Sequence, residues 1–296
     1  MRILVPVDDS PQTLKVIDFL SRRESLLGSN PEIELVNVQY SVPESLIHLL
    51  GIESVKAYCM AEGKKVFDLL NAEGAERLAA TEKVLYGEPG KTIAHEAEET
   101  KADLIIMGSR GLNPVKSLFL GSVSNSVLAN TTTPMLLLRD ESANLPDKLR
   151  VGIFVDGSEY GAAAATFVLQ NLPLFGKESE FTVVHAAEEL PAPIAPNPIG
   201  PMVPRLTREE IDQTQRQDFE EAVRPVLEPF KEAGVKIEAK LLFGDPDSVL
   251  PEYANDCLDL IVMGSHGYGN FTAAVMGSTA MHVGARTKKP ILIVRK

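Results

Sequence analysis

The stretch ADLIIMGSRGLNPVKSLFLGS, residues 102–122, contains the pattern that decides the fold. Its apolar run ends at a glycine, and the chain returns to Gly-Ser before the next segment begins. Residues 258–278, LDLIVMGSHGYGNFTAAVMGS, repeat this arrangement with different intervening residues. Both copies share the spacing Gly-x2-Gly-x9-Gly-Ser. An apolar run without alternation, such as LIIM, is typical of a parallel strand that is covered on both faces.

Three more pairs of segments recur in the same order and identify the chain as a duplication. They are ILVPVDDS and VGIFVDGS (3–10 and 151–158), VLYGEP and LLFGDP (84–89 and 241–246), and TTPMLLLR and KKPILIVR (132–139 and 288–295). The sequence therefore predicts two related domains, residues 1–143 and 149–296, joined through the polar run DESANLPDK at 140–148.

Short apolar segments alternate with longer helical patterns in each copy. In the first copy the predicted strands are residues 3–7, 33–38, 83–86, 104–107 and 135–138. In the second, residues 207–210 read as a capping box, followed by a helix with an apolar face (Phe219, Ala222, Val223, Val226, Leu227 and Phe230). We therefore predict an α/β fold: two tandem copies of an open five-stranded parallel sheet with helices on both faces.

Composition narrows the classes of function. The 296 residues carry a net charge of −12, which argues against a general nucleic-acid or anionic-membrane binder. The two cysteines provide neither a disulfide framework nor a metal-binding spacing. The first residues read as a strand rather than a signal peptide, and no apolar run is long enough to span a bilayer. A cytoplasmic protein is expected.

Ligands of parallel α/β sheets bind at the carboxyl ends of the strands. That edge should carry the glycine loops, whose last glycine precedes predicted helices at 123–129 and 279–285. A helix start offers free N–H groups and partial positive charge to a phosphate. The alternative is that the glycines simply end the strands. Residues 87–92, GEPGKT, resemble a P-loop but lack its first glycine, so a helix-starting turn is predicted there instead.

Asp8 and Asp156 follow the first strand of each copy. Each carboxylate has two readings, a partner for ribose or Mg²⁺, or a helix N-cap. Since Ser10 and Ser158 are themselves good caps, the ligand role is preferred. Full Mg-ATP affinity in an Asp8→Ala/Asp156→Ala double variant would contradict it.

Through these motifs nearly the whole chain resembles the universal stress protein family in its tandem form. In that family an intact glycine motif marks ATP-binding members, which implies ATP as ligand, with Mg²⁺ at the two aspartates. The resemblance implies these first-copy binding residues: Pro6, Val7, Asp8, Val38, Met107, Gly108, Gly111, Gly121, Ser122 and Val123. Arg110 lies inside the first glycine loop and is a further candidate for a phosphate contact. In the second copy the resemblance implies Val155, Asp156, Ala186, Met263, Gly264, Gly267, Gly277, Ser278 and Thr279, and His266 takes the place of Arg110 in the loop as a candidate phosphate contact.

The copies differ along the expected adenine wall, where Phe154 replaces Pro6 and Ala186 replaces Val38. Both copies are expected to bind ATP, the first more tightly. Retained affinity in Gly121→Ala together with loss in Gly277→Ala would reverse that order. His185, at a strand end, is expected to be a satisfied packing residue.

No nucleophile or general base stands out, so catalysis is not assigned. The expected function is a stress-response regulator or ATP-dependent switch, with an unidentified protein partner. The alternatives are a weak ATPase or autokinase on the same site, and a scaffold that binds no nucleotide. Family members pair through the last strand, so residues 135–138 and 291–294 are expected to pair within the chain, and a homodimer is a further expectation. The proline-rich residues 189–205 either cover the ligand edge or form a surface loop or subunit contact.

Overall fold

The computed structural model describes residues 1–109, 121–139, 145–188, 207–266 and 276–295. Five strands form the first half: β1 (Arg2–Pro6), β2 (Glu32–Tyr40), β3 (Thr81–Gly87), β4 (Leu104–Gly108) and β5 (Met135–Leu138). Five form the second: β6 (Arg150–Phe154), β7 (Glu180–Ala187), β8 (Ile237–Phe243), β9 (Leu260–Gly264) and β10 (Ile291–Val294). The predicted α/β class is confirmed.

The helices of the first half are α1 (Pro11–Arg22), α2 (Glu24–Leu27), α3 (Glu44–Leu50), α4 (Ile52–Ala72), the 3₁₀ turn η1 (Ala75–Leu78), α5 (Pro89–Glu99) and α6 (Ser122–Asn130). Those of the second are α7 (Glu159–Gln170), α8 (Leu172–Phe175), α9 (Arg208–Glu232), α10 (Pro246–Cys257) and α11 (Ser278–Arg286). The predicted capping box at Thr207 and Glu210 is confirmed at the start of α9. So is the helix-starting turn at residues 87–92, where Glu88 caps α5.

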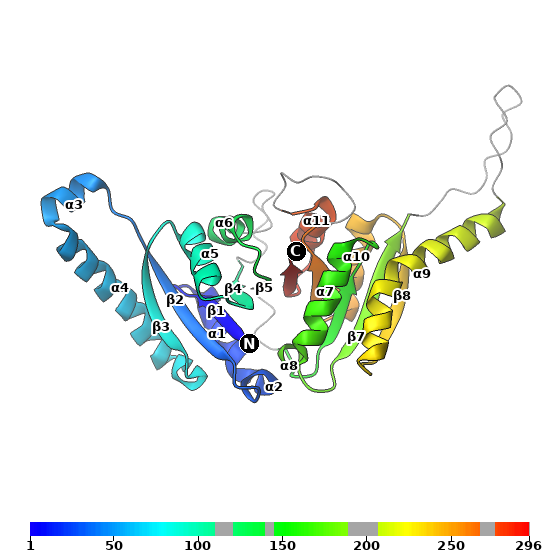
Figure 1. Ribbon diagram of the computed structural model, residues 1–296, viewed down its shortest axis with the longest axis horizontal. Coiled ribbons are helices and arrows are strands. Elements are labelled where there is room, and N and C mark those ends of the chain that lie inside the picture. Colours follow the sequence, from blue (N-terminus) through cyan, green and yellow to red (C-terminus); the bar gives the residue numbers. More distant parts are fainter. Residues whose placement is uncertain (110–120, 140–144, 189–206, 267–275, 296) are drawn as a thin grey trace, which may run out of the picture.

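The ten strands of the described residues belong to one sheet, in the order β3-β2-β1-β4-β5-β10-β9-β6-β7-β8 (Figure 1). Within each half every pair is parallel, as predicted. The two five-stranded sheets are joined by β5 and β10, which pair antiparallel with Leu136 opposite Leu292. This is the pairing of residues 135–138 with 291–294 that the family resemblance implies.

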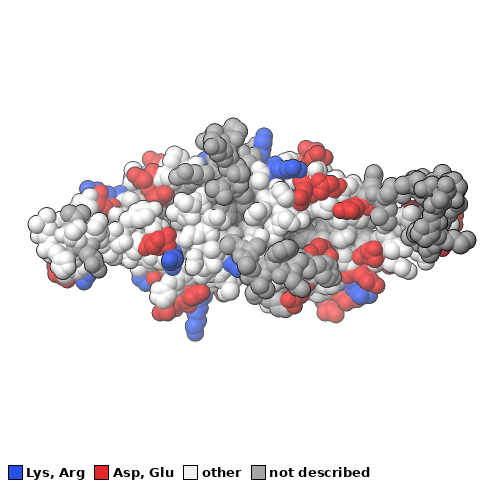
Figure 2. Space-filling model, turned by 90° about the horizontal axis from the view of Figure 1, so that it is seen from above, with Lys and Arg blue, Asp and Glu red and all other residues white. Residues whose placement is uncertain are grey.

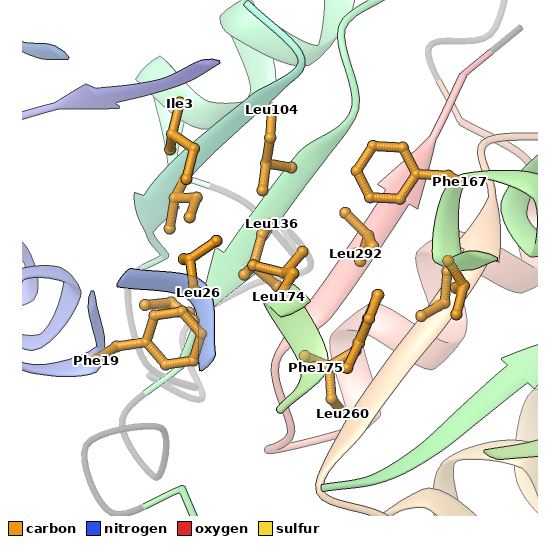
Figure 3. Close-up of a cluster of buried hydrophobic side chains, with 14 of the residues drawn as sticks. Ile3, Phe19, Leu26, Leu104, Leu136, Phe167, Leu174, Phe175, Leu260 and Leu292 are labelled. Carbon is orange, nitrogen blue, oxygen red and sulfur yellow. The ribbon is translucent and has the colours of Figure 1, made fainter. Parts of the chain in front are cut away.

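Two apolar layers cover the faces of this sheet and continue across the joint. Successive strand residues alternate between them, so Leu136 and Leu292 belong to one layer and Leu137 and Ile291 to the other. The first layer contains residues of α1, α4, α7 and α9; the second contains residues of α5, α6, α10 and α11. Figure 3 shows labelled side chains of the first layer from both halves, gathered about the joint. The halves therefore share a core.

A buried arginine ties the first half to the segment that leads into β6. Arg23, only 2% exposed, donates from Nη1 to the carbonyl oxygens of Pro146 (2.8 Å) and Asp147 (3.0 Å). Its guanidinium carbon lies 4.8 Å from the centre of the Phe19 ring. Burial lowers the pKa of Arg23, while the Asp147 carboxylate opposes that shift. The sequence predicted residues 145–148 only as part of a polar connection, whereas in the structure Arg23 binds this segment to the first half.

Acidic side chains outnumber basic ones on the surface. On the face shown in Figure 2, lysines and arginines are scattered among more frequent aspartates and glutamates. None of the helices in the described ranges is long and apolar enough to cross a membrane.

Candidate functional site

A cavity of about 250 Å³ lies where β1, β2 and β4 end, beside the first turns of α1, α5 and α6. In the strand order β1 and β4 are neighbours although they are far apart in sequence, so this is the switch point where α/β sheets bind ligands. It is lined by every described residue predicted for the first half: Pro6, Val7, Asp8, Val38, Met107, Gly108, Gly121, Ser122 and Val123. The predicted residues Arg110 and Gly111 lie outside the described residues.

The second half has an equivalent cavity of about 280 Å³ at the ends of β6, β7 and β9. It too is lined by every predicted residue that the structure describes: Val155, Asp156, Ala186, Met263, Gly264, His266, Gly277, Ser278 and Thr279. Gly267 and the proline-rich segment 189–205 lie outside the described residues. The structure therefore brings together two sets of residues that are dispersed along the chain.

The third glycine of each motif begins a helix that opens onto its cavity. Gly121 and Gly277 are the N-cap residues, and the helices start at the serines, one residue earlier than predicted. The first intrahelical bonds to these caps are donated by the N–H groups of Asn125 (2.9 Å) and Met281 (3.0 Å). The three N–H groups before each of them have no helical acceptor. They belong to cavity-lining residues: Ser122, Val123 and Ser124 in one half, and Ser278, Thr279 and Ala280 in the other.

The first glycine of each motif serves the packing of a helix, a reason that the sequence reading missed. Gly108 ends β4, and a Cβ added there would lie 2.7 Å from Gln12 Cβ and 3.0 Å from the Gln12 carbonyl oxygen. A Cβ on Gly264 would lie 2.5 Å from Tyr160 Cβ. The prediction that these glycines let the backbone approach a ligand is therefore incomplete. Their lack of a side chain also lets α1 and α7 start close to the sheet.

Gly108→Ala should lower the free energy of unfolding by about 1–3 kcal/mol, because the added methyl group overlaps backbone that cannot move independently of α1. Gly121→Ala is the matched control. A Cβ at Gly121 meets nothing within 4 Å, so its cost should stay near that of a poorer N-cap, below about 1 kcal/mol. Chemical denaturation of both variants measures the difference, and equal losses would contradict the packing role.

Asp8 is held by the turn that starts α1. Its Oδ1 accepts from Ser10 N (3.1 Å), Ser10 Oγ (2.5 Å) and Thr13 Oγ1 (2.6 Å). In the second half Asp156 Oδ1 accepts from Ser158 N (3.0 Å). Ser10 and Ser158 occupy the N-cap positions, but neither side chain makes a capping hydrogen bond. The serines therefore stand at the cap positions expected for them but make no side-chain capping bond, and the aspartates take part in ordering both turns.

A polar residue on the second strand of each half, buried in the first and partly buried in the second, supports the same edge. Asn37 Nδ2 donates to the Val7 carbonyl oxygen at 2.8 Å, and His185 Nδ1 lies 3.0 Å from the Val155 carbonyl oxygen. For His185 to donate, the proton must be on Nδ1. The prediction that His185 is a satisfied packing residue is confirmed. The asparagine was missed because nothing in the local sequence indicates which carbonyl it reaches.

Other lining residues were also missed. They are Ser10, Gln12, Thr13, Val36, Asn37, Tyr40, Pro89, Ile93 and Ser124 in the first cavity, and Gly161, Pro246, Leu250 and Ala280 in the second. The repeated GEP and GDP segments were a usable signal, since Pro89 and Pro246 begin α5 and α10 beside the cavities. Phe154, noted as a replacement for Pro6, is 4% exposed and lines the second cavity.

Charged groups are few around the cavities. Among the described lining residues, Asp8 is the charged side chain of the first cavity, whereas Asp156 and His266 line the second. His266 Nδ1 lies 3.0 Å from Ser265 Oγ, and its ring centroid lies 5.5 Å from that of Tyr160. Within the described ranges no three His, Cys, Asp or Glu side chains are grouped as a metal site. An anion at either cavity would have the helix N–H groups as its principal protein partners.

Comparison with known proteins adds a family to this geometry. Residues 1–139 and 149–295 each match the sequence model of the Universal stress protein family. A universal stress protein of Mycolicibacterium smegmatis is 27% identical over 198 residues, which are 66% of this chain and 62% of that protein. Universal stress protein YxiE of Bacillus subtilis is 27% identical over 150 residues, covering 47% of this chain and 98% of its own length.

The fold has a solved counterpart that spans both halves. A crystal structure of a universal stress protein from Archaeoglobus fulgidus aligns with a TM-score of 0.68 at 21% identity, covering 99% of this chain and 98% of that one. At this identity the likeness concerns the fold. The match to the M. smegmatis protein leaves more than a third of that relative unaligned.

Proposed function

The chain belongs to the universal stress protein family, and from the two cavities we propose that it binds ATP in each half and acts as a cytoplasmic, ATP-dependent stress-response regulator. One observation carries the proposal. In both halves, three N–H groups without helical acceptors belong to residues that line a cavity beside a carboxylate and an apolar wall. Phosphates bind well at such helix starts, and the apolar groups suit the base.

The site residues have distinct proposed roles. Val38 and Met107 form the apolar wall for adenine in the first half, and Ala186 and Met263 do so in the second. The helix starts at Ser122 and Ser278 hold phosphate oxygens. His266 adds a second-half contact to phosphate, the role also proposed for Arg110 in the first.

Mg²⁺ fits the aspartates as a partner that arrives with the nucleotide. Magnesium is commonly held by one or two carboxylates together with the phosphates of a substrate. The three described hydrogen bonds to the Asp8 carboxylate all end on Oδ1, so Oδ2 is the oxygen proposed to face ribose or a hydrated Mg²⁺. The ion would also offset repulsion between that carboxylate and phosphate.

Calorimetric titration of Mg-ATP into nucleotide-stripped protein tests the proposal. Two sites per chain are expected, with the first-half site the tighter. One site would restrict the nucleotide role to one half, and folded protein that binds none would overturn it in favour of a scaffold. Phosphate release clearly above that of a variant with both sites blocked would favour the alternative of a weak ATPase.

The Asp8→Ala/Asp156→Ala double variant should bind Mg-ATP about tenfold more weakly, because each site loses its proposed carboxylate ligand. Titrations with and without Mg²⁺ separate this role from the ordering of the turns. Metal-free ATP should lose less affinity, since its phosphates no longer need the carboxylate-bound ion. Unchanged Mg-ATP affinity would show that the aspartates serve only the turns.

A further inference from the structure

Each half ends in an arginine that reaches into the other half. Arg139 follows β5, and its Nη2 donates to the carbonyl oxygen of Gly284 in α11 at 2.5 Å. Arg295 follows β10, and its Nη1 donates to the carbonyl oxygens of Leu128 in α6 and of Thr131, the latter at 3.0 Å. Arg139 is 3% exposed. These are long-range bonds between equivalent parts of the two copies.

The two contacts occur at equivalent positions of the two copies. Leu128 and Gly284 occupy the same position in their helices, each seven residues after the N-cap glycine. Both lie in the last turn, where carbonyl groups have no partner within the helix. A guanidinium there satisfies such a carbonyl and lies at the negative end of the helix dipole. The arrangement is therefore favourable at both helix ends.

The antiparallel joint explains why the bonds cross. Because β5 and β10 run in opposite directions, the residue after one strand lies beside the residues that lead into the other. Those leading residues come directly from the carboxyl end of α6 or α11. Each terminal arginine is thus placed against the neighbouring half's helix. Figure 1 shows these helices, α6 and α11, on either side of the joint.

The helices that receive these arginines are the ones that open onto the cavities. α6 begins at Ser122 and α11 at Ser278, both cavity-lining residues. Each helix has nine residues and so spans only about 13 Å from cavity to arginine. A short helix moves as a unit, so a group that fixes its carboxyl end also limits the tilt and position of its amino end.

We propose that Arg139 and Arg295 are positioning residues that act across the joint, each holding the phosphate-binding helix of the opposite half. Arg295 then sets the first-half site and Arg139 the second, which couples the two sites through the strands between them. The proposal rests on the proposed function for its binding consequence, but the holding of the helices can be measured without a ligand.

The environment of Arg295 suits this role. Burial lowers the pKa of its guanidinium, while Tyr160 acts in the opposite direction. Hydrogen bonds to a charged donor strengthen in a less polar setting. Tyr160 in turn packs near His266 at the second cavity, so Arg295 also has a neighbour in its own half. Although Arg295 has neighbours in both halves, we expect it to affect α6 in the first half more than α11 in its own.

Amide hydrogen exchange of the nucleotide-free protein is the first test. Arg295→Met should speed exchange in residues 122–130 and leave residues 278–286 near wild type, whereas Arg139→Met should do the reverse. Arg295→Lys, which keeps the charge but not the planar fork, should give an intermediate change. If Arg295→Met fails to fold, the exchange rates of Arg295→Lys still test the proposal. Acceleration of the same-half helix, of both helices alike, or of neither would overturn the proposal.

Titration with Mg-ATP tests the consequence for binding. In a Gly277→Val background, which retains only the first-half site, Arg295→Met should raise Kd about fivefold or more; in a Gly121→Val background it should not. Arg286→Met is a matched control, because Arg286 lies in the last turn of α11 and donates to Asp247 O within its own half. It should leave residues 122–130 and the first-half Kd unchanged.

The two measurements separate the two hypotheses. Wild-type protein that binds no nucleotide would overturn the proposed function, while the crossed exchange pattern would still show that the arginines hold the helices. Binding with an uncrossed pattern would support the proposed function and overturn the positioning role.

Discussion

Gly176→Ala is expected to lower the free energy of unfolding by more than about 4 kcal/mol, a loss found when several penalties combine. Gly176 follows α8 with φ of 97°, a backbone conformation that is strained for other residues. A Cβ there would lie 1.5 Å from the carbonyl oxygen of Asp147 and 2.5 Å from its carbonyl carbon. Both atoms are backbone, so no side-chain rotation relieves the overlap. Denaturation in urea, followed by circular dichroism, measures the loss.

Gly234→Ala provides the matched control for this substitution. Gly234 also has a positive φ, 68°, but a Cβ there meets nothing within 4 Å. Its cost should therefore be about 1 kcal/mol, that of the backbone conformation alone. Losses of similar size at the two glycines would contradict the close contact between Gly176 and the residues leading into β6.

The contact between Gly176 and Asp147 also affects how α2 of the first half packs against α8 of the second. Asp147 is the residue whose carbonyl oxygen also accepts from Arg23, and its carboxylate accepts from Ser25 Oγ at 3.0 Å. A displaced Asp147 would therefore disturb the contact between α2 and α8 as well. We expect amide exchange in residues 24–27 and 172–175 to increase together in any folded Gly176→Ala protein.

Gly121→Val should weaken binding of Mg-ATP in the first half by about a hundredfold or more, some 2.7 kcal/mol. A Cβ at Gly121 meets no atom within 4 Å, so the added side chain is not opposed by the protein itself. It would instead occupy space at the helix start, where the phosphates are proposed to bind. Calorimetry should show the stoichiometry fall from two sites per chain to one.

The reciprocal variant is the control for that result. Gly277→Val should remove the second-half site and leave the first, and the double variant should bind no nucleotide. Gly121→Val should cost only about 1–2 kcal/mol of stability, since a Cβ there meets nothing within 4 Å and valine is a poor N-cap. Retention of two sites in Gly121→Val would place the ligand elsewhere, and loss of only the weaker site would reverse the expected order of affinities.

Most of the fold could be predicted from local pattern. Runs such as LIIM and MLLL are uninterrupted because the strands are covered on both faces, and the 3.6-residue period of Ala222, Val223, Val226 and Phe230 follows from one buried face of α9. Strand ends were placed less well. β2 extends from Glu32 to Tyr40 rather than over 33–38, because pairing with β3 continues beyond the apolar residues.

The candidate site was also largely predictable, for a topological reason. Parallel strands place all their carboxyl ends on one edge, so residues after β1, β2 and β4 meet although the chain separates them. What they do in detail was less accessible. The serines were expected to cap α1 and α7, yet the Ser10 hydroxyl donates to Asp8 instead. A serine hydroxyl can donate one hydrogen bond and accept others, so only the turn geometry decides whether its oxygen also accepts from a helix N–H group.

By itself, then, the sequence determined the duplication, the parallel α/β architecture and the location of both cavities, because these depend on local periodicity, on repetition and on the common edge where parallel strands end. The pairing of the two last strands was expected only from the family resemblance. The tertiary structure alone decided which groups meet across the chain. Gly108 faces Gln12, and Asn37 donates to the Val7 carbonyl oxygen. Arg139 donates to a carbonyl oxygen of α11, and Arg295 donates to one of α6. Such contacts depend on ångström-scale distances between elements brought together by folding, and no spacing along the sequence encodes them.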